Sequence, residues 1–130
     1  MYEIAEHFCW QISLRAGRPL GQLLLQRDAT VTLCHSKSRE LPSLCRSADL
    51  LIAAVGQVGL VDKQCLRGDQ IVLDVGTTMC GEQLMGDVNA ADADALVRAY
   101  SPVPGGVGAV TTAVLLRNLV TAAERSIQKA

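Results

Sequence analysis

The sequence predicts a single α/β domain in which a parallel sheet carries helices on both faces. Runs rich in β-branched and aliphatic residues alternate with helical patterns along the chain, as in successive strand–helix–strand units. Two of these runs, residues 50–55 and 71–75, are almost entirely apolar, which is typical of strands covered on both faces. Apolar residues make up 49% of the chain and aromatic residues only 3%, which suits an aliphatic core. A chain of 130 residues is long enough for one domain but not for two.

Local signals predict the individual elements in chain order. Residues 8–12 form a weak first strand, and the β-branched content of residues 30–34 predicts a second. Pro19 and Pro42 each suit the first turn of a helix, so helices are expected over residues 19–26 and 39–46. Alanines between residues 91 and 95 favour a further helix over residues 92–99.

The longest helix is predicted over residues 111–127, and it carries two adjacent apolar rows. The first row has helical spacing and comprises Val110, Ala113, Leu116, Val120, Ala123 and Ile127; the second comprises Leu115, Leu119 and Ala122. One row can face the sheet. The second is then either exposed or available to a partner.

The segment that leads into this helix, residues 101–111, reads Ser-Pro-Val-Pro-Gly-Gly-Val-Gly-Ala-Val-Thr. Its two prolines fix φ and remove backbone donors, and its three glycines let another molecule approach the backbone closely. We expect Thr111 to cap the N-terminus of the helix, where negative or electron-rich ligand atoms are favoured. Taken alone, the segment is equally consistent with a tight strand-to-helix connection.

Charge and cysteine usage exclude several classes of function. A formal net charge of −1 argues against a nucleic-acid or anionic-membrane surface, and no apolar run approaches the ~18 residues of a membrane span. No signal peptide is legible. The five cysteines are scattered without a C-x-x-C pair, so we expect no zinc or other metal site and a reduced, cytoplasmic compartment. Cys34 is expected to pack as a small hydrophobe.

Six blocks in this order resemble the C-terminal NAD(P)-binding domain of the bifunctional methylenetetrahydrofolate dehydrogenase/methenyltetrahydrofolate cyclohydrolase family. They are Gly17-Arg18-Pro19 before a leucine-rich helix, residues 29–36, 48–56, 71–76 and 86–88, and Pro-Val-Pro-Gly-Gly-Val-Gly at 102–108. The resemblance extends from about residue 17 to about residue 126. It implies a Rossmann-like domain that binds NADP in one-carbon folate metabolism, as part of an oxidoreductase and hydrolase.

In a complete family enzyme, hydride passes from 5,10-methylenetetrahydrofolate to NADP and the resulting methenyl ring is hydrolysed. The resemblance implies that the folate is clamped between two domains, with one wall formed by Pro104, Gly105, Gly106 and Val107. The N-terminal folate domain of the family carries a catalytic Tyr-x-x-x-Lys pair. Neither Tyr2 nor Tyr100 has a lysine four residues later. We therefore expect no catalytic residue in this chain, and a tetrahydrofolate ligand only together with a folate-binding domain.

The first glycine turn of the domain departs from the family pattern. Counting back from Gly17 and Arg18 aligns Ser13 with the family's serine, but Gln11 stands where a glycine lets the backbone approach the pyrophosphate, and Ile12 replaces the next residue. The cofactor turn is therefore expected to be damaged. Ser13, Gly17 and Arg18 remain its candidate binding residues.

One explanation of this departure is a reading-frame shift. The codons for Cys-Trp-Gln-Ile at residues 9–12, read one nucleotide later, give Val or Ala, Gly, then Lys or Arg, close to the missing family motif. We therefore divide the chain into an atypical segment, residues 1–16, that is degraded or frameshifted, and an NAD(P)-binding domain, residues 17–130. Because Trp followed by Gln always gives Gly in that frame, a chance agreement stays open.

The end of the second strand indicates the cofactor preference. NAD-selective domains place an acid there for the ribose hydroxyls, whereas residues 34–39 contain no acid and two cations. Ser36 with Lys37 and Arg39 would suit the 2′-phosphate of NADP. A polar, solvated loop is the alternative. His35 is expected to be a packing residue of this loop rather than a catalyst.

Further candidates follow the central strands, where α/β folds bind ligands. The resemblance places Gly56 near the nucleotide and Thr77 beside the nicotinamide. Asp74 and Asp87 are expected to be structural hydrogen-bond acceptors rather than catalytic acids.

Three functions stay open at this point. The first is a dehydrogenase/cyclohydrolase fragment without activity on its own, the second is a standalone nucleotide-binding module that completes a site with a partner, and the third is an oligomerisation domain, with a homodimer among the options. The departure at Gln11 and the missing lysine favour the first.

Overall fold

A computed structural model of the chain describes residues 7–11, 17–35 and 37–128. Its elements are β1 (His7–Gln11), α1 (Gly17–Leu25), β2 (Thr30–Cys34), α2 (Leu41–Ser47), β3 (Leu50–Ala53), β4 (Ile71–Asp74), β5 (Thr78–Cys80), β6 (Gln83–Met85), α3 (Ala90–Leu96), β7 (Ala99–Ser101) and α4 (Val107–Ile127). The predicted α/β class is confirmed.

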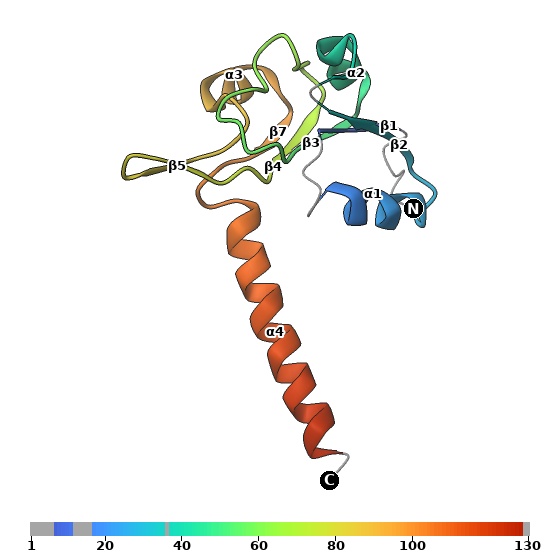
Figure 1. Cartoon of the computed structure of the whole chain (residues 1–130), viewed down its shortest axis with the longest axis vertical. Helices are drawn as coiled ribbons and strands as arrows, with labels where there is room; N and C mark the ends of the chain where they lie inside the picture. Colours follow the sequence, from blue (N-terminus) through green and yellow to red (C-terminus); the bar gives the residue numbers. More distant parts are fainter. Residues whose placement is uncertain (1–6, 12–16, 36, 129–130) are drawn as a thin grey trace.

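The main sheet has five parallel strands in the order β2-β1-β3-β4-β7 (Figure 1). The chain runs outward from β1 to β2 and then crosses back to place β3 on the other side of β1. This reversal makes a topological switch point between β1 and β3, where open α/β sheets bind ligands at the carboxyl ends of their strands. Gln11, the last residue of β1, lies at this point, paired in register with Cys34 of β2 and Ala53 of β3.

Side chains of β3 alternate between two apolar clusters, as the two-residue period of a strand requires. Leu51 and Ala53 pack with residues of α2 and α3, whereas Ile52 packs with residues of α1. Figure 1 accordingly shows α2 and α3 on one side of the sheet and α1 on the other. The predicted covering of both faces is confirmed, and the central strands are buried because helices cover them on both sides.

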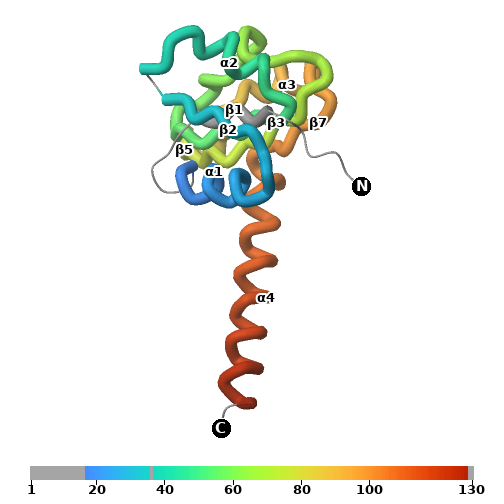
Figure 2. The backbone as a smooth tube through the Cα atoms, turned by 90° about the vertical axis from the view of Figure 1, so that its right-hand side faces the viewer, coloured from blue at the N-terminus to red at the C-terminus, as the bar shows by residue number. Residues whose placement is uncertain are grey.

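The long helix α4 does not pack on the sheet. It leaves the domain after β7 and projects away from it, as both views show (Figures 1 and 2). None of its residues is buried, and Leu115 and Leu119 are 67% and 66% exposed. The prediction that one apolar row faces the sheet is therefore wrong. Local periodicity identifies an apolar helix face, but it does not say which surface covers that face.

Short elements account for the other differences. Strands β5, β6 and β7 have three residues each, too few for an alternation signal, and β5 and β6 form an antiparallel hairpin. Helix α3 ends at Leu96 rather than at residue 99, because Val97 is extended and residues Ala99–Ser101 pair with β4. Strand β2 has the predicted bounds, and β1, β3 and β4 lie within one or two residues of theirs.

Candidate functional site

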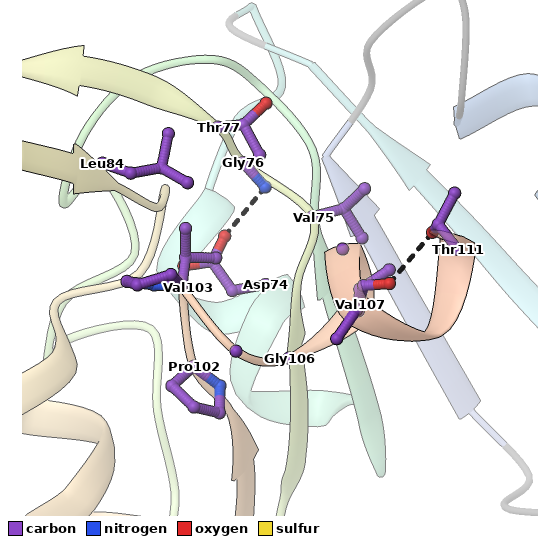
Figure 3. A pocket seen from close by; sticks show the side chains of 14 residues that line it. Asp74, Val75, Gly76, Thr77, Leu84, Pro102, Val103, Gly106, Val107 and Thr111 are labelled. Atoms are coloured by element: carbon purple, nitrogen blue, oxygen red, sulfur yellow. Dashed lines mark hydrogen bonds between the residues drawn. The ribbon is translucent and has the colours of Figure 1, made fainter. Parts of the chain in front are cut away.

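A pocket of about 420 Å³ opens at the carboxyl end of β4, between that strand and the loop that joins β7 to α4. Its lining brings together the predicted Thr77 and the predicted loop residues Pro104, Gly105, Gly106 and Val107, with Asp74, Val75, Gly76, Leu84, Pro102, Val103, Gly108, Ala109 and Thr111 (Figure 3). Most of the lining is apolar. Leu84 comes from the β5–β6 hairpin, which no sequence signal predicted.

The loop 102–106 needs its glycines for its own turn. Gly105 has φ of +98°, a left-handed conformation that other residues rarely adopt. A Cβ atom on Gly106 would overlap Ser101 Oγ and the carbonyl oxygen of Pro102. Gly106 therefore lets the loop pack closely against Ser101 and Pro102 of the same segment, and this packing forms the pocket wall.

The predicted cap at Thr111 is wrong. Helix α4 begins at Val107, its N-cap is Gly106, and no side chain caps it. Thr111 lies one turn inside the helix, where its hydroxyl donates a hydrogen bond of 2.9 Å to the carbonyl oxygen of Val107 (Figure 3). The helix begins earlier because residues 107–110 adopt helical geometry in spite of Gly108. Thr111 still contributes to the pocket lining.

Beneath the pocket, two fully buried carboxylates organise the carboxyl edge of the sheet. Asp74 Oδ1 accepts hydrogen bonds from the amides of Gly76 (2.9 Å) and Asp87 (3.0 Å), and its Oδ2 accepts one from the amide of Val88 (3.0 Å). Asp87 Oδ2 accepts bonds from the amides of Val55 (2.5 Å) and Gly56 (2.9 Å). The prediction that both are structural acceptors is confirmed.

The environment of Asp74 has two opposing effects. Burial raises the pKa of its carboxyl above the usual value, while the backbone hydrogen bonds from Val88, Asp87 and Gly76 act in the opposite direction. Half-buried Tyr100 lies beside it, with its hydroxyl 3.5 Å from Asp74 Oδ2. Burial, together with the nearby charges of Asp74 and Asp94, raises the pKa of Tyr100 to about 12, so this hydroxyl stays protonated at neutral pH.

The second part of the candidate site is the topological switch point between β1 and β3. Gly17 is buried at the start of α1, and Arg18 next to it is exposed. Gly56 follows β3 with φ of +74°, and a Cβ atom built on it meets nothing within 4 Å, so the space above it is open. Ile12 and Ser13 lie outside the described residues.

The turn after β2 is built from its own polar groups. The amide of His35 donates to Ser38 Oγ (2.9 Å), and the amide of Lys37 donates to His35 Nδ1 (3.1 Å). His35 is exposed, so the prediction that it is a packing residue is wrong: its ring holds the turn instead. Lys37 and Arg39 are both exposed, and Ser36 lies outside the described residues.

Other classes of site find no support in the described part of the chain. Among residues 7–11, 17–35 and 37–128, no three histidine, cysteine or acidic side chains group in a way that could hold a metal ion. None of the helices described there is long and apolar enough to cross a membrane.

A parallel sheet covered by helices on both faces, with a strand order that reverses between β1 and β3 and a first helix that begins at a glycine, is the architecture of a dinucleotide-binding α/β domain. The sequence identifies its family. Residues 11–127 match the tetrahydrofolate dehydrogenase/cyclohydrolase NAD(P)-binding domain, and the chain belongs to this family.

Known relatives are about twice as long as this chain or longer. It is 45% identical over 114 residues to the bifunctional protein FolD of Dictyoglomus thermophilum, an alignment that covers 88% of this chain and 40% of that protein. Among solved structures, the Trypanosoma brucei methylenetetrahydrofolate dehydrogenase-cyclohydrolase complexed with NADP cofactor and inhibitor superposes with a TM-score of 0.86 at 35% identity. That match covers 94% of this chain and 44% of the other. The Campylobacter jejuni FolD enzyme gives a TM-score of 0.85 at 36% identity, with 94% and 44% coverage.

Proposed function

We propose that this chain binds NADP at the carboxyl edge of the sheet, across the switch point between β1 and β3, and that it forms the nucleotide half of a methylenetetrahydrofolate dehydrogenase/cyclohydrolase site. The observation that carries the proposal is the reversal of strand order between β1 and β3, with an acid-free turn that holds two cations at the end of the adjacent strand β2. The NADP complex of a relative with 35% identity supports the choice of cofactor.

The residues present suit the parts of NADP in turn. Lys37 and Arg39, with Ser36 between them and β2, would hold the 2′-phosphate by charge and hydrogen bonds. Gly17 and Arg18 at the start of α1, with Ser13, would hold the pyrophosphate, since a helix N-terminus favours anions. The open backbone at Gly56 and the Thr77 side chain would face the nicotinamide half. When bound, NADP supplies the hydride acceptor.

The pocket at the carboxyl end of β4 is the proposed contact with the folate. Its wall of Pro104, Gly105, Gly106 and Val107 is apolar and lies next to Thr77, so a flat heteroaromatic ring can lie against it. The family's Tyr-x-x-x-Lys pair has no counterpart in this sequence. The chain alone is therefore expected to bind the nucleotide without turning over substrate, and a folate-binding domain must supply the acid–base chemistry.

A second candidate is a module that acts only with a partner, and the exposure of α4 favours it. A helix that is apolar on most sides is normally covered.

We also propose a cytoplasmic location for the protein and a degraded or frameshifted origin for residues 1–16. The encoding DNA tests the latter, because a shifted frame without a family-like strand upstream of Gly17 would exclude a frameshift.

Calorimetric titration of the purified chain with NADP and with NAD tests the main proposal. We expect tighter binding of NADP than of NAD. Replacing both Lys37 and Arg39 by glutamine should weaken NADP binding by at least roughly 100-fold, since hydrogen bonds to charged groups contribute about 1.5–3 kcal/mol each and two such residues are lost. NAD affinity should stay the same. Arg117→Gln, which removes an exposed cation on α4, is the matched control. Equal affinities for the two nucleotides, or no binding of either, would contradict the proposal.

A mixing experiment separates the two candidate functions. The chain alone should give no methylenetetrahydrofolate-dependent reduction of NADP, whereas addition of a folate-binding domain from a relative should restore some activity if the site can be completed in trans. Turnover by the chain alone would refute the expectation that it lacks catalytic residues.

A further inference from the structure

Asp87 stands out because its carboxylate is completely buried and yet serves a loop rather than a helix or strand. Both bonds that its Oδ2 accepts come from the amides of Val55 and Gly56, the residues that follow β3. These two residues lie more than 30 positions away in sequence. They follow β3 directly and therefore lie at the carboxyl edge of the sheet, beside the switch point between β1 and β3.

The segment that carries Asp87 is itself held at both ends. The amide of Asp87 donates to Asp74 Oδ1 and the amide of Val88 donates to Asp74 Oδ2, each at 3.0 Å. The carbonyl oxygen of Asp87 accepts a bond of 3.0 Å from the amide of Val61, on the far side of the same loop. Asp87 is therefore fixed to the end of β4 by its backbone, and it fixes the end of β3 by its side chain.

Glycines make this arrangement sterically feasible. A Cβ atom on Gly76 would overlap the Asp87 carboxylate, and one on Gly86 would overlap the Asp74 carboxylate. Two glycines thus leave room for two buried carboxylates at the carboxyl edge of the sheet.

Stability alone does not account for the carboxylate. Burying a charged group is costly unless its hydrogen-bonding capacity is satisfied. Within the described part of the chain, Asp87 Oδ1 is buried without a hydrogen-bond partner. Both bonds that Asp87 Oδ2 accepts instead fix the orientation of the Val55 and Gly56 amides at the carboxyl edge of the sheet.

We propose that Asp87 is a positioning residue for the nucleotide: its carboxylate holds the Val55–Gly56 backbone in the conformation that binds the half of NADP lying over β3 and β4. This inference rests on the proposed function. If the turn after β2 holds the 2′-phosphate, the sheet order β2-β1-β3-β4 requires the rest of the dinucleotide to extend across β1 toward β3. The Asp87 carboxylate then supports binding of the nicotinamide half of NADP and has no influence on binding of the adenosine 2′-phosphate half.

Adenosine 2′,5′-bisphosphate, which lacks the nicotinamide half, makes this division measurable. We expect Asp87→Ala to raise the Kd for NADP at least tenfold while the Kd for the bisphosphate changes less than twofold. Asp87→Asn should restore most of the NADP affinity, because its amide oxygen can accept the same two backbone bonds. Asp92→Ala is the matched control: Asp92 also accepts a bond from a distant loop amide, that of Lys63 at 3.0 Å, but it lies on α3. Its affinities should equal those of the wild type.

Each outcome has a defined meaning. Wild-type chain that binds neither ligand refutes the proposed function. If the wild-type chain binds both ligands, two results for the folded Asp87→Ala variant refute this inference alone. One is unchanged affinity for both ligands, and the other is an equal loss of affinity for both.

A measurement on the unmodified protein covers the case in which Asp87→Ala does not fold. Amide hydrogen exchange without nucleotide should show the Val55 and Gly56 amides protected, because Asp87 holds them before any ligand arrives. The amide of exposed Gln57, which donates no such bond to any residue in the described part of the chain, is the internal reference. Val55 and Gly56 amides that exchange as fast as Gln57, and become protected only when NADP is added, would overturn the inference.

Discussion

Replacing Gly76 with alanine is the most direct perturbation of the carboxylate pair. The new Cβ atom would lie 2.6 Å from the amide nitrogen of Asp87 and would overlap its carboxylate. Gly76 does not have a positive φ, so alanine is conformationally permitted there and the cost comes from the contact alone. Since part of the obstruction is backbone, rotation of a side chain cannot relieve it.

The structure sets the expected magnitude. Making room for the methyl group requires the Asp87 segment to withdraw, which weakens the bonds that its carboxylate accepts from Val55 and Gly56. Loss of one hydrogen bond to a charged group costs about 1.5–3 kcal/mol, and overpacking a tight site costs about 1–3 kcal/mol. We therefore expect the free energy of unfolding to fall by about 2.5–6 kcal/mol, a large part of the roughly 5–15 kcal/mol typical of a domain.

Urea unfolding of the full chain, followed by circular dichroism, measures this change. Gly68→Ala is the matched control, because a Cβ atom there would lie 3.5 Å from the carbonyl oxygen of Leu96, an ordinary contact. We expect the control to stay within about 1 kcal/mol of the wild type. If Gly76→Ala unfolds with the same midpoint and slope as Gly68→Ala, the claim that the two glycines make room for the carboxylates is refuted.

Three further predictions concern other parts of the chain. Because Thr111 is not a cap, Thr111→Ala should lower the free energy of unfolding by less than about 0.5 kcal/mol, whereas Asn89→Ala, which removes the true N-cap of α3, should cost about 1 kcal/mol in the same urea assay. A hydrogen bond with Cys45 is the main cause that lowers the pKa of the Cys65 thiol from 9.0 to about 7. Between pH 7 and pH 9, Cys65 therefore binds fewer protons in the folded state than in the unfolded state. The free energy of unfolding should therefore rise between pH 7 and pH 9, by an amount on the order of 2 kcal/mol, and this rise is lost as the pH falls through 7; a flat profile, or the same profile in Cys65→Ser, would contradict it. Replacing both Leu115 and Leu119 with glutamine should reduce binding of a hydrophobic fluorescent dye, since both side chains are exposed on α4, and unchanged fluorescence would mean that this face is covered in solution.

Four strands, β1 to β4, could be predicted from the sequence, whereas the order of the strands in the sheet could not. Residues 50–53 and 71–74 are aliphatic runs, and their burial on two faces is encoded locally. Strand β7 has three residues and forms only because residues 99–101 meet β4, so its existence depends on a partner strand that is distant in sequence. Helix propensity alone places the end of α3 at residue 99, because it does not detect the pairing with β4 that ends the helix at Leu96.

The site divides along the same line. The prolines and glycines of residues 102–108 indicate this loop, the family resemblance indicates Thr77 and the wall 104–107, and the structure brings them together in one pocket. The roles of Asp74 and Asp87 as acceptors could be predicted, but their donors could not, because Val55 and Gly56 are 32 and 31 residues from Asp87. Leu84 gives no signal because the hairpin that carries it is too short to show a pattern.

The separation of α4 from the sheet has a consequence for the order in which the protein loses structure. No side chain of α4 belongs to either core cluster, so fraying of the helix from its far end leaves the packing of the sheet unchanged. A protease should therefore shorten the helix progressively while the sheet stays intact. The exception is the start of the helix, residues 107–111, because Val107, Ala109 and Thr111 line the pocket. A digest that stops before it reaches Thr111 would preserve the pocket, and one that removes these residues would open the pocket on one side without unfolding the domain.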